Sequence, residues 1–301
     1  MNKEQVEEIK QSYAITEEEF QKMYEEIKTI TFENHEPNKD GNPTAIFTGG
    51  QPGAGKSSII LKTKQEFVKQ NKDLIVFDLD IYRGFYKNSI EIAKKYPELY
   101  SEITGKASGR VMEMLSEEAI KKGYDFILEG TMGKSVYTLD VLKKYRDDYN
   151  IIARLMAVSK EESLLSIFER YIEMKKNMGI GRLTQIESHN KKYSNFTNVA
   201  TTLETRGVEV EVHERSEDIS NPKLIYKTSN KNNTYSSVLE AIIMGRSNSH
   251  KQCMLTAGKR LESIKKDLIQ LSEQDKYIVE INKLTEIIEE LVKKEGEEER
   301  D

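Results

Sequence analysis

A glycine-rich segment near residue 50 constrains the fold of this 301-residue chain more than any other part of its sequence. Residues 50–57 read GQPGAGKS and satisfy the spacing G-x-x-x-x-G-K-[ST] of a phosphate-binding loop. Before the loop, residues 44–48 form an apolar run that favours a strand, and residues 58–69 after it have helical periodicity. Strand, loop and helix in this order predict a nucleotide-triphosphate site, whereas a plain glycine-rich linker is the alternative. The residues expected on the buried face of that helix are Ile59, Ile60, Thr63, Phe67 and Val68.

The residue types of the loop match the chemistry of phosphate binding. Glycines let the backbone curl so that successive N–H groups face phosphate oxygens, and the positive end of the following helix adds to the attraction. Lys56 is expected to reach the β- and γ-phosphates, and Ser57 to place its hydroxyl on a bridging Mg²⁺. The predicted nucleotide-binding residues are Gly50, Gln51, Pro52, Gly53, Ala54, Gly55, Lys56, Ser57 and Ser58.

Composition limits the classes of protein that the chain can belong to. The formal net charge is −5, with 32% charged residues, which argues against non-specific binding of nucleic acid. Cys253 is the only cysteine, so the chain cannot form an internal disulfide or assemble a cysteine-based metal site. No signal-like leader and no long apolar run is visible. We therefore expect a cytoplasmic protein that does not interact with membranes.

Apolar periodicity predicts strands that alternate with helices. A capping box at Thr16 predicts a helix to about Thr29, and Gly123 is expected to end another. These patterns predict an α/β fold of the P-loop NTPase type, a mainly parallel sheet with helices on both faces, plus a C-terminal helical extension. The expected strands are residues 44–48, 74–80, 124–130, 151–158, 209–213 and 224–226, and the later helices are residues 89–95, 108–122, 136–145 and 160–176.

Three parts of the chain are distinguished by these patterns. Residues 1–43 are expected to form an N-terminal helical segment, residues 44–256 a P-loop kinase domain, and residues 257–301 an amphipathic helical extension. The extension contains two runs of leucine and isoleucine at three- and four-residue spacing. Neither run is long enough to choose between a hairpin folded on its own domain and an oligomer contact.

Acidic residues at the predicted strand ends indicate which reaction the loop serves. A hydroxyl kinase needs a carboxylate near the γ-phosphate, and Asp80 is the candidate for this general base. Asp78 is assigned either to water-mediated magnesium binding or to capping the next turn. Glu129 and Thr131 are expected at the same edge of the sheet, with capping of the following helix as the alternative for Thr131.

Two arginines are candidates for stabilising the transferred phosphate. Arg170 and Arg182 flank residues 175–181, a lysine- and glycine-containing segment that has the composition of a lid. As single arginines, both are also compatible with a purely surface position.

The ordered set of motifs resembles the zeta toxin family of bacterial toxin–antitoxin systems, which are P-loop kinases. The resemblance rests on residues 49–57 and on the order of further elements along the chain. It covers the region from about Ala45 to Lys192. The further elements are Asp78-Leu-Asp80, Glu129-Gly-Thr131, Phe168-Glu-Arg-Tyr171 and Arg182.

This resemblance implies phosphorylation of UDP-N-acetylglucosamine with ATP or GTP and Mg²⁺, which blocks synthesis of cell-wall precursors. By position, Lys56 and Ser57 correspond to the phosphate and metal residues, Asp80 to the base, and Arg170 and Arg182 to the arginines on the transferred phosphate. The implied substrate-binding residues are Asp80, Glu113, Glu129 and Thr131, joined by Arg110 and by Lys134, which stands where family members often carry an arginine.

Several alternatives remain open at the level of the sequence. Arg110 and Glu113 are also suited to an ion pair along one helix. An antibiotic or a nucleic-acid 5′-hydroxyl would use the same loop and base, and a regulatory module would bind nucleotide without transferring phosphate. The family resemblance further implies a small helical antitoxin that blocks the nucleotide site, and both terminal helical segments are candidates for docking it or for self-inhibition.

Overall fold

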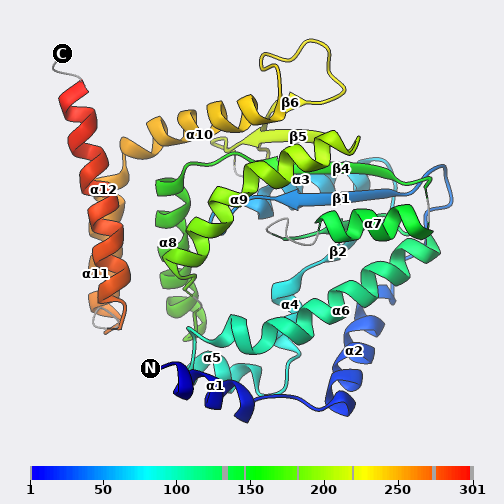
Figure 1. The fold of residues 1–301 in the computed structure, drawn as a ribbon, viewed down its shortest axis with the longest axis horizontal. Coiled ribbons are helices and arrows are strands. Elements are labelled where there is room, and N and C mark those ends of the chain that lie inside the picture. The colour runs from blue at the N-terminus through cyan, green and yellow to red at the C-terminus, as the bar shows by residue number, and fades with distance from the viewer. Residues whose placement is uncertain are drawn as a thin grey trace. The chain divides into compact units, whose positions relative to one another are not determined.

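The computed structural model describes residues 2–130, 135–145, 147–181, 183–218, 220–272 and 276–298. Within these residues, six strands form one mostly parallel sheet in the order β2-β3-β1-β4-β5-β6, and helices separate the successive strands from β1 to β5 along the chain (Figure 1). The strands are β1 (Thr44–Gly49), β2 (Ile75–Phe77), β3 (Phe126–Leu128), β4 (Asn150–Met156), β5 (Glu209–Glu214) and β6 (Lys223–Lys227). The predicted α/β class is confirmed.

The chain divides into two compact units. The first contains Met1–Gly49 and Ile60–Ala153, and the second contains Gly50–Ile59 and Arg154–Asp301. Helix α3 (Lys56–Lys69) begins in the second unit and ends in the first. The phosphate loop therefore belongs to the second unit, and the predicted acidic residues belong to the first.

In the first unit, β3 lies between β1 and β2 and is parallel to both. Phe47 and Phe77 are each in register with Leu128, so β2 and β3 end at the same level and β1 runs on to Gly49. A buried apolar cluster of this unit joins strands β1 and β3 to helix α3. It consists of Ile46, Ile60, Phe67 and Ile127. The helices of this unit are α1 (Lys3–Ser12), α2 (Glu17–Phe32), α4 (Leu79–Gly84), α5 (Ser89–Lys95), α6 (Tyr100–Lys122) and α7 (Ser135–Tyr145).

The predicted capping box opens helix α2. The Thr16 hydroxyl accepts the Glu19 N–H at 3.2 Å, and the Glu19 carboxylate accepts the Thr16 N–H at 2.9 Å. The helix packs on α6 and runs to Phe32, three residues further than predicted. Its buried face consists of Phe20, Met23, Tyr24 and Ile27.

Several features of the first unit differ from the sequence prediction. Strand β2 stops at Phe77 because the Asp78 side chain caps a new helix. Helix α6 begins at Tyr100 rather than at residue 108, and it ends as predicted at Gly123, whose φ is 78°. Val68 was expected to be buried but is 76% exposed, because at about 100° per residue it lies on the side of the helix opposite Ile59.

In the second unit, β5 and β6 form an antiparallel pair at the edge of the sheet. A buried cluster of Ala54, Ile59, Met156 and Val158 joins the phosphate loop to the end of β4. The helices of this unit are α8 (Lys160–Met178), α9 (Ile186–Thr205), α10 (Val238–Met254), α11 (Ala257–Gln270) and α12 (Ile278–Glu298).

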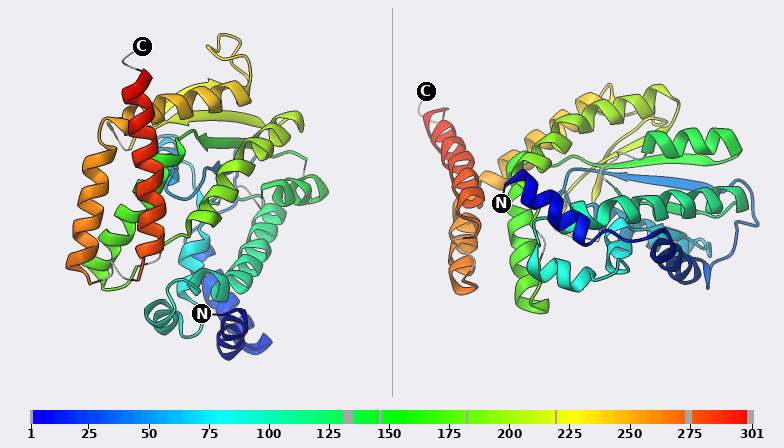
Figure 2. Two further views of the ribbon diagram at one scale, coloured as in Figure 1. Left: turned by 60° about the vertical axis from the view of Figure 1, so that its left-hand side comes forward. Right: turned by 60° about the horizontal axis from the view of Figure 1, so that its bottom comes forward.

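Helices α11 and α12 lie side by side and pack on α8 (Figure 2). Tyr171 of α8 meets Tyr277 edge-on, with ring centroids 5.1 Å apart. Burial of each leucine or isoleucine in this interface contributes about 1.5–3 kcal/mol. Of the two arrangements left open by the sequence, the hairpin folded on its own unit is the one observed. The buried apolar residues of the hairpin are Leu261, Ile264, Leu268, Ile281, Leu284 and Ile288.

No helix within the described residues combines the length and the apolar character that crossing a membrane requires.

Candidate functional site

The phosphate loop runs from Gly50 to Gly55, directly between β1 and the first turn of α3. Gly53 and Gly55 have φ values of 79° and 92°, a region that other residues rarely adopt. A Cβ atom on Gly53 would lie 2.1 Å from the Ser163 carbonyl oxygen, so this position also lacks space for a side chain. The sequence folds into this loop because glycine occurs where the backbone must turn and where α8 approaches.

Lys56 lies at the start of α3, and its side chain turns back over the loop. The Nζ atom donates to the carbonyl oxygens of Gly50 at 3.2 Å and Gln51 at 3.3 Å. Ser57 follows in the first turn of the helix and is exposed. A loop at a helix N-terminus with an ammonium group above it suits an anion such as a nucleotide triphosphate. The residues present therefore fit the nucleotide, and Ser57 is the residue that would hold its magnesium ion.

A buried polar chain supports the loop from the side of α8. Gln51 donates through Nε2 to the Val158 carbonyl at 2.8 Å and to the Ser163 hydroxyl at 3.1 Å. The Ser163 hydroxyl also lies 2.8 Å from Nε2 of His189, a fully buried residue. Burial lowers the pKa of His189 to about 4, so its imidazole is neutral at pH 7. Gln51 thus contributes to the loop through its side chain as well as its backbone.

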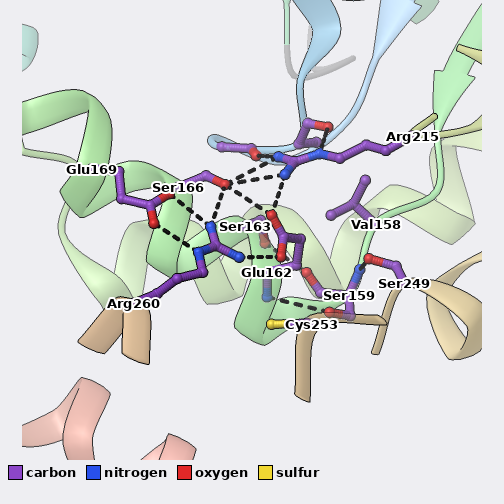
Figure 3. Close-up of polar contacts among 12 residues, drawn as sticks. Val158, Ser159, Glu162, Ser163, Ser166, Glu169, Arg215, Ser249, Cys253 and Arg260 are labelled. Carbon is purple, nitrogen blue, oxygen red and sulfur yellow. Dashed lines mark hydrogen bonds and ion pairs between the residues drawn. The ribbon is translucent and has the colours of Figure 1, made fainter. Parts of the chain in front are cut away.

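Arg215 is a cation at the loop that the sequence analysis missed. Its Nε donates to the Ala54 carbonyl at 3.3 Å, and its Nη2 donates to the Gly53 carbonyl. The same guanidinium binds the carboxylate of Glu162 (Figure 3). Arg215 follows β5 and is 162 residues away from Gly53 in the sequence, and no motif pointed to it.

The first unit brings acidic residues to one edge of its sheet. Asp78 and Glu129 follow the in-register residues Phe77 and Leu128, and the Glu129 N–H donates to the Phe77 carbonyl at 2.9 Å. The Asp78 carboxylate accepts the N–H groups of Asp80 at 2.8 Å and Ile81 at 3.4 Å. Of the two roles considered for Asp78, the helix cap is the one observed.

Asp80 lies in the first turn of α4 rather than at a strand end, and its side chain is 52% exposed. Arg83 places its Nε 3.3 Å from the Asp80 carboxylate. The nearly buried Arg83 is itself fixed to α6, because Nη1 donates to the Ser101 carbonyl at 2.7 Å and to the Thr104 hydroxyl at 3.0 Å. Arg83 therefore orients Asp80. The spacing of three residues between Asp80 and Arg83 in a helix is the sequence signal for this pair.

Arg110 of α6 is held by helix α2. Its two terminal nitrogens donate to the Glu17 carboxylate at 2.7 Å each, and its guanidinium lies 3.9 Å from the centre of the Phe20 ring. Hydrogen bonds from Arg110 lower the pKa of Glu17 to about 2. The partner observed for Arg110 is therefore Glu17, 93 residues away, instead of Glu113 on its own helix. Glu113 is half-buried on α6.

The structure describes some of the remaining predicted site residues and not others. Arg170 is exposed on α8. Residues 175–178 of the expected lid belong to α8, which ends at Gly179 with a φ of 70°. Thr131, Lys134 and Arg182 lie outside the described residues.

No group of three or more histidine, cysteine, aspartate or glutamate side chains suited to a metal ion occurs in the part of the chain that the structure describes. A phosphate loop binds Mg²⁺ through its serine hydroxyl and the nucleotide phosphates, and does not require such a group.

A glycine-rich phosphate loop after the first strand of a mostly parallel sheet defines an α/β protein of the P-loop type. The chain belongs to the Zeta toxin family, whose family model matches residues 25–231. This is a family of ATP-using kinases. The match ends before α10, so helices α10, α11 and α12 lie beyond it.

Individual relatives agree with this assignment. The chain is 26% identical to Toxin PezT of Streptococcus pneumoniae over 231 residues, which is 74% of this chain and 87% of that toxin. It is 28% identical to Toxin zeta of Streptococcus agalactiae over 172 residues, or 56% of this chain and 58% of that toxin. A solved structure of the PezAT toxin–antitoxin system of Streptococcus pneumoniae is similar in fold. Its TM-score is 0.65 at 21% identity, with 84% of this chain and 98% of the other covered.

Proposed function

We propose that the protein is a toxin kinase that transfers the γ-phosphate of ATP or GTP to a hydroxyl of UDP-N-acetylglucosamine. The consequence would be a block in cell-wall precursor synthesis in the cytoplasm, where that sugar nucleotide is made. The observation that carries the proposal is the phosphate loop, with Lys56 at the start of α3, in a member of a kinase family. The proposed arrangement is a kinase domain of residues 44–256 with helical segments on either side.

The proposed reaction assigns one task to each group of residues. The loop N–H groups and Lys56 bind the nucleotide phosphates, and Mg²⁺ held by Ser57 would neutralise part of their charge. The carboxylate of Asp80 accepts the proton of the attacking hydroxyl. A bond forms between that oxygen and the γ-phosphorus while the bond from the γ-phosphorus to the bridging oxygen breaks, and the nucleoside diphosphate leaves. Arg170 and Arg182 stabilise the charge on the transferred group.

The acceptor is proposed to contact residues of the first unit. Glu129 and Asp80 both follow strands whose carboxyl ends lie together, which supports a shared site at that edge. Glu113, Thr131 and Lys134 are proposed as further substrate-binding residues on the family resemblance. Arg110 is proposed with them, and its bonds to Glu17 mean that helix α2 would have to release it or present it in this position.

We also propose an antitoxin as a partner. The related solved structure comes from a toxin–antitoxin system, which supports a protein inhibitor for this chain. Purification of the tagged protein from its native host, followed by mass spectrometry of the proteins that co-purify with it, tests for a stable complex with a small helical antitoxin. Free toxin under these conditions would contradict a tight antitoxin.

The acceptor is tested by incubating the purified protein with ATP, Mg²⁺ and UDP-N-acetylglucosamine and measuring the mass of the sugar nucleotide. A product heavier by one phosphate is expected with the native protein and not with Lys56→Met. Parallel reactions contain an aminoglycoside antibiotic or an oligonucleotide with a free 5′-hydroxyl. Phosphate transfer to one of these, and not to the sugar nucleotide, would contradict the proposed acceptor. Absence of transfer to any of them, together with intact nucleotide binding, would favour a regulatory module.

A further inference from the structure

A chain of ion pairs links the C-terminal hairpin to the phosphate loop within the second unit. The Arg215 guanidinium binds the loop carbonyls of Gly53 and Ala54 and one carboxylate oxygen of Glu162. The other oxygen of Glu162 accepts a hydrogen bond from Arg260 of α11. Figure 3 shows these side chains converging between α8, α11 and the loop.

The Arg260 end of this series of ion pairs is also fixed. Arg260 forms a bidentate pair with Glu169, in which Nε and Nη2 donate at 2.7 Å each. The Ser166 hydroxyl lies between the two arginines, 3.2 Å from Nη1 and Nη2 of Arg215 and 3.4 Å from Nη2 of Arg260. A fork-to-fork pair of this kind restricts orientation as well as distance. The position of Arg215 is therefore determined partly by a residue of the hairpin.

The balance of charges in this cluster explains how Arg260 of the hairpin affects Arg215 at the phosphate loop. The cluster contains two guanidinium groups, Arg215 and Arg260, and two carboxylates, Glu162 and Glu169. Burial alone would raise the pKa of Glu162, but the hydrogen bond from Arg260 and the charges of both arginines lower it, so it is ionised. Without Arg260, two carboxylates would compete for Arg215. Glu169 already attracts Arg215 electrostatically, and without its own partner Arg260 it would act on this guanidinium together with Glu162.

The contact with Arg215 affects the surface that binds phosphate. Each peptide bond in the described chain is trans, so a carbonyl oxygen and the following N–H point in opposite directions. When Arg215 holds the Ala54 carbonyl, the Gly55 N–H points away from Arg215. The arginine thus fixes the peptide plane that aims this donor, and its charge lies next to Gly55, with Nε 3.4 Å from where a Cβ would be.

We propose that the C-terminal hairpin sets the nucleotide affinity of the phosphate loop through the chain Arg260–Glu162–Arg215. Arg260 and Arg215 act as positioning residues, and the hairpin is a support for nucleotide binding rather than an inhibitor of it. This proposal rests on nucleotide binding by the loop but not on the identity of the acceptor. Because the family match ends at residue 231, the support comes from a part of the chain beyond the matched region.

The test compares Arg260→Met with Lys176→Met. Lys176 of α8 forms a 2.7 Å ion pair with Asp267, so it also joins α8 to α11, but this pair does not contact the loop. Binding of a non-hydrolysable ATP analogue is measured by calorimetry, and backbone amide exchange of residues 50–58 by mass spectrometry without nucleotide. Arg260→Met should weaken nucleotide binding about 10-fold and accelerate exchange in the loop, whereas Lys176→Met should change neither.

Two milder variants keep the test decisive if Arg260→Met does not fold. Arg260→Lys retains the charge without the fork and should recover part of the affinity. Glu169→Gln loosens Arg260 from the far side and should give an intermediate rate of loop exchange. Native affinity and native exchange in all Arg260 and Glu169 variants would overturn the proposal, as would equal effects of Arg260→Met and Lys176→Met. Because amide exchange needs no substrate, failure to phosphorylate UDP-N-acetylglucosamine would refute only the proposed acceptor.

Discussion

Replacement of Gly53 by alanine, with a matched control, tests whether the phosphate loop depends on the close approach of Gly53 to α8. Gly53 has a φ of 79°, and a Cβ there would lie 2.1 Å from the Ser163 oxygen and 3.0 Å from Cγ1 of Ile167. Gly207, in the same unit, has the same φ of 79°, but nothing lies within 4 Å of its Cβ position. The two substitutions share the backbone penalty and differ only in the steric contact.

The expected cost follows from these distances. An alanine in this left-handed region costs about 1 kcal/mol, which is the whole effect expected for Gly207→Ala. At Gly53, an ordinary carbon–oxygen contact of about 3.3 Å requires the loop or α8 to move by about 1.2 Å. Ser163 is fully buried and holds both Gln51 and His189, so the movement strains packed structure. Overpacking of this kind adds about 1–3 kcal/mol, for a total of about 2–4 kcal/mol.

The assay is urea unfolding of both variants, together with calorimetric binding of an ATP analogue. Gly53→Ala should lose about 1–3 kcal/mol more stability than Gly207→Ala and bind the nucleotide at least about 10-fold more weakly. Equal losses of stability, with unchanged affinity in Gly53→Ala, would refute the role assigned to the contact with Ser163.

Two further predictions concern buried titratable groups. The folded pKa of His189, about 4, is below its ordinary value of 6.5, so the unfolded chain binds the proton first as the pH falls. Stability should therefore decline between about pH 6.5 and pH 4, by up to about 3 kcal/mol from this residue. Urea titrations should show a shallower decline in His189→Gln, and an identical slope would contradict the assignment. Burial raises the pKa of Cys253 to about 12, and the residue is 1% exposed. Its thiol should react with a disulfide reagent at pH 8 only after denaturation, and rapid reaction of the native protein would disprove its burial.

The sequence predicted the elements with strong local signals. The phosphate loop, the capping box at Thr16 and the glycine stop at residue 123 each depend on neighbouring residues, and the structure has them where expected. Strand β2 was predicted too long because Asp78 reads equally well as a strand end and as a helix cap. Only the fold shows that its carboxylate accepts the next N–H groups.

The sequence did not predict contacts between residues that lie far apart along the chain. Arg215 and Arg260 contact residues between 49 and 162 positions away, and no local pattern distinguishes them from surface arginines. Arg110 was expected near the substrate or Glu113, but its partner Glu17 belongs to another helix. The hairpin was predicted as two helices, whereas its packing on α8 depends on tertiary contacts that the spacing could not reveal.

In the proposed function, Asp80 accepts the proton of the attacking hydroxyl, and replacement of this residue tests the proposal most directly. The direct measurement is single-turnover phosphate transfer from ATP to UDP-N-acetylglucosamine by the native protein and by Asp80→Asn, with ATP-analogue affinity measured on the same samples. We expect unchanged nucleotide affinity and a transfer rate lower by about two to four orders of magnitude in the variant. Transfer by Asp80→Asn at the native rate would contradict the proposal.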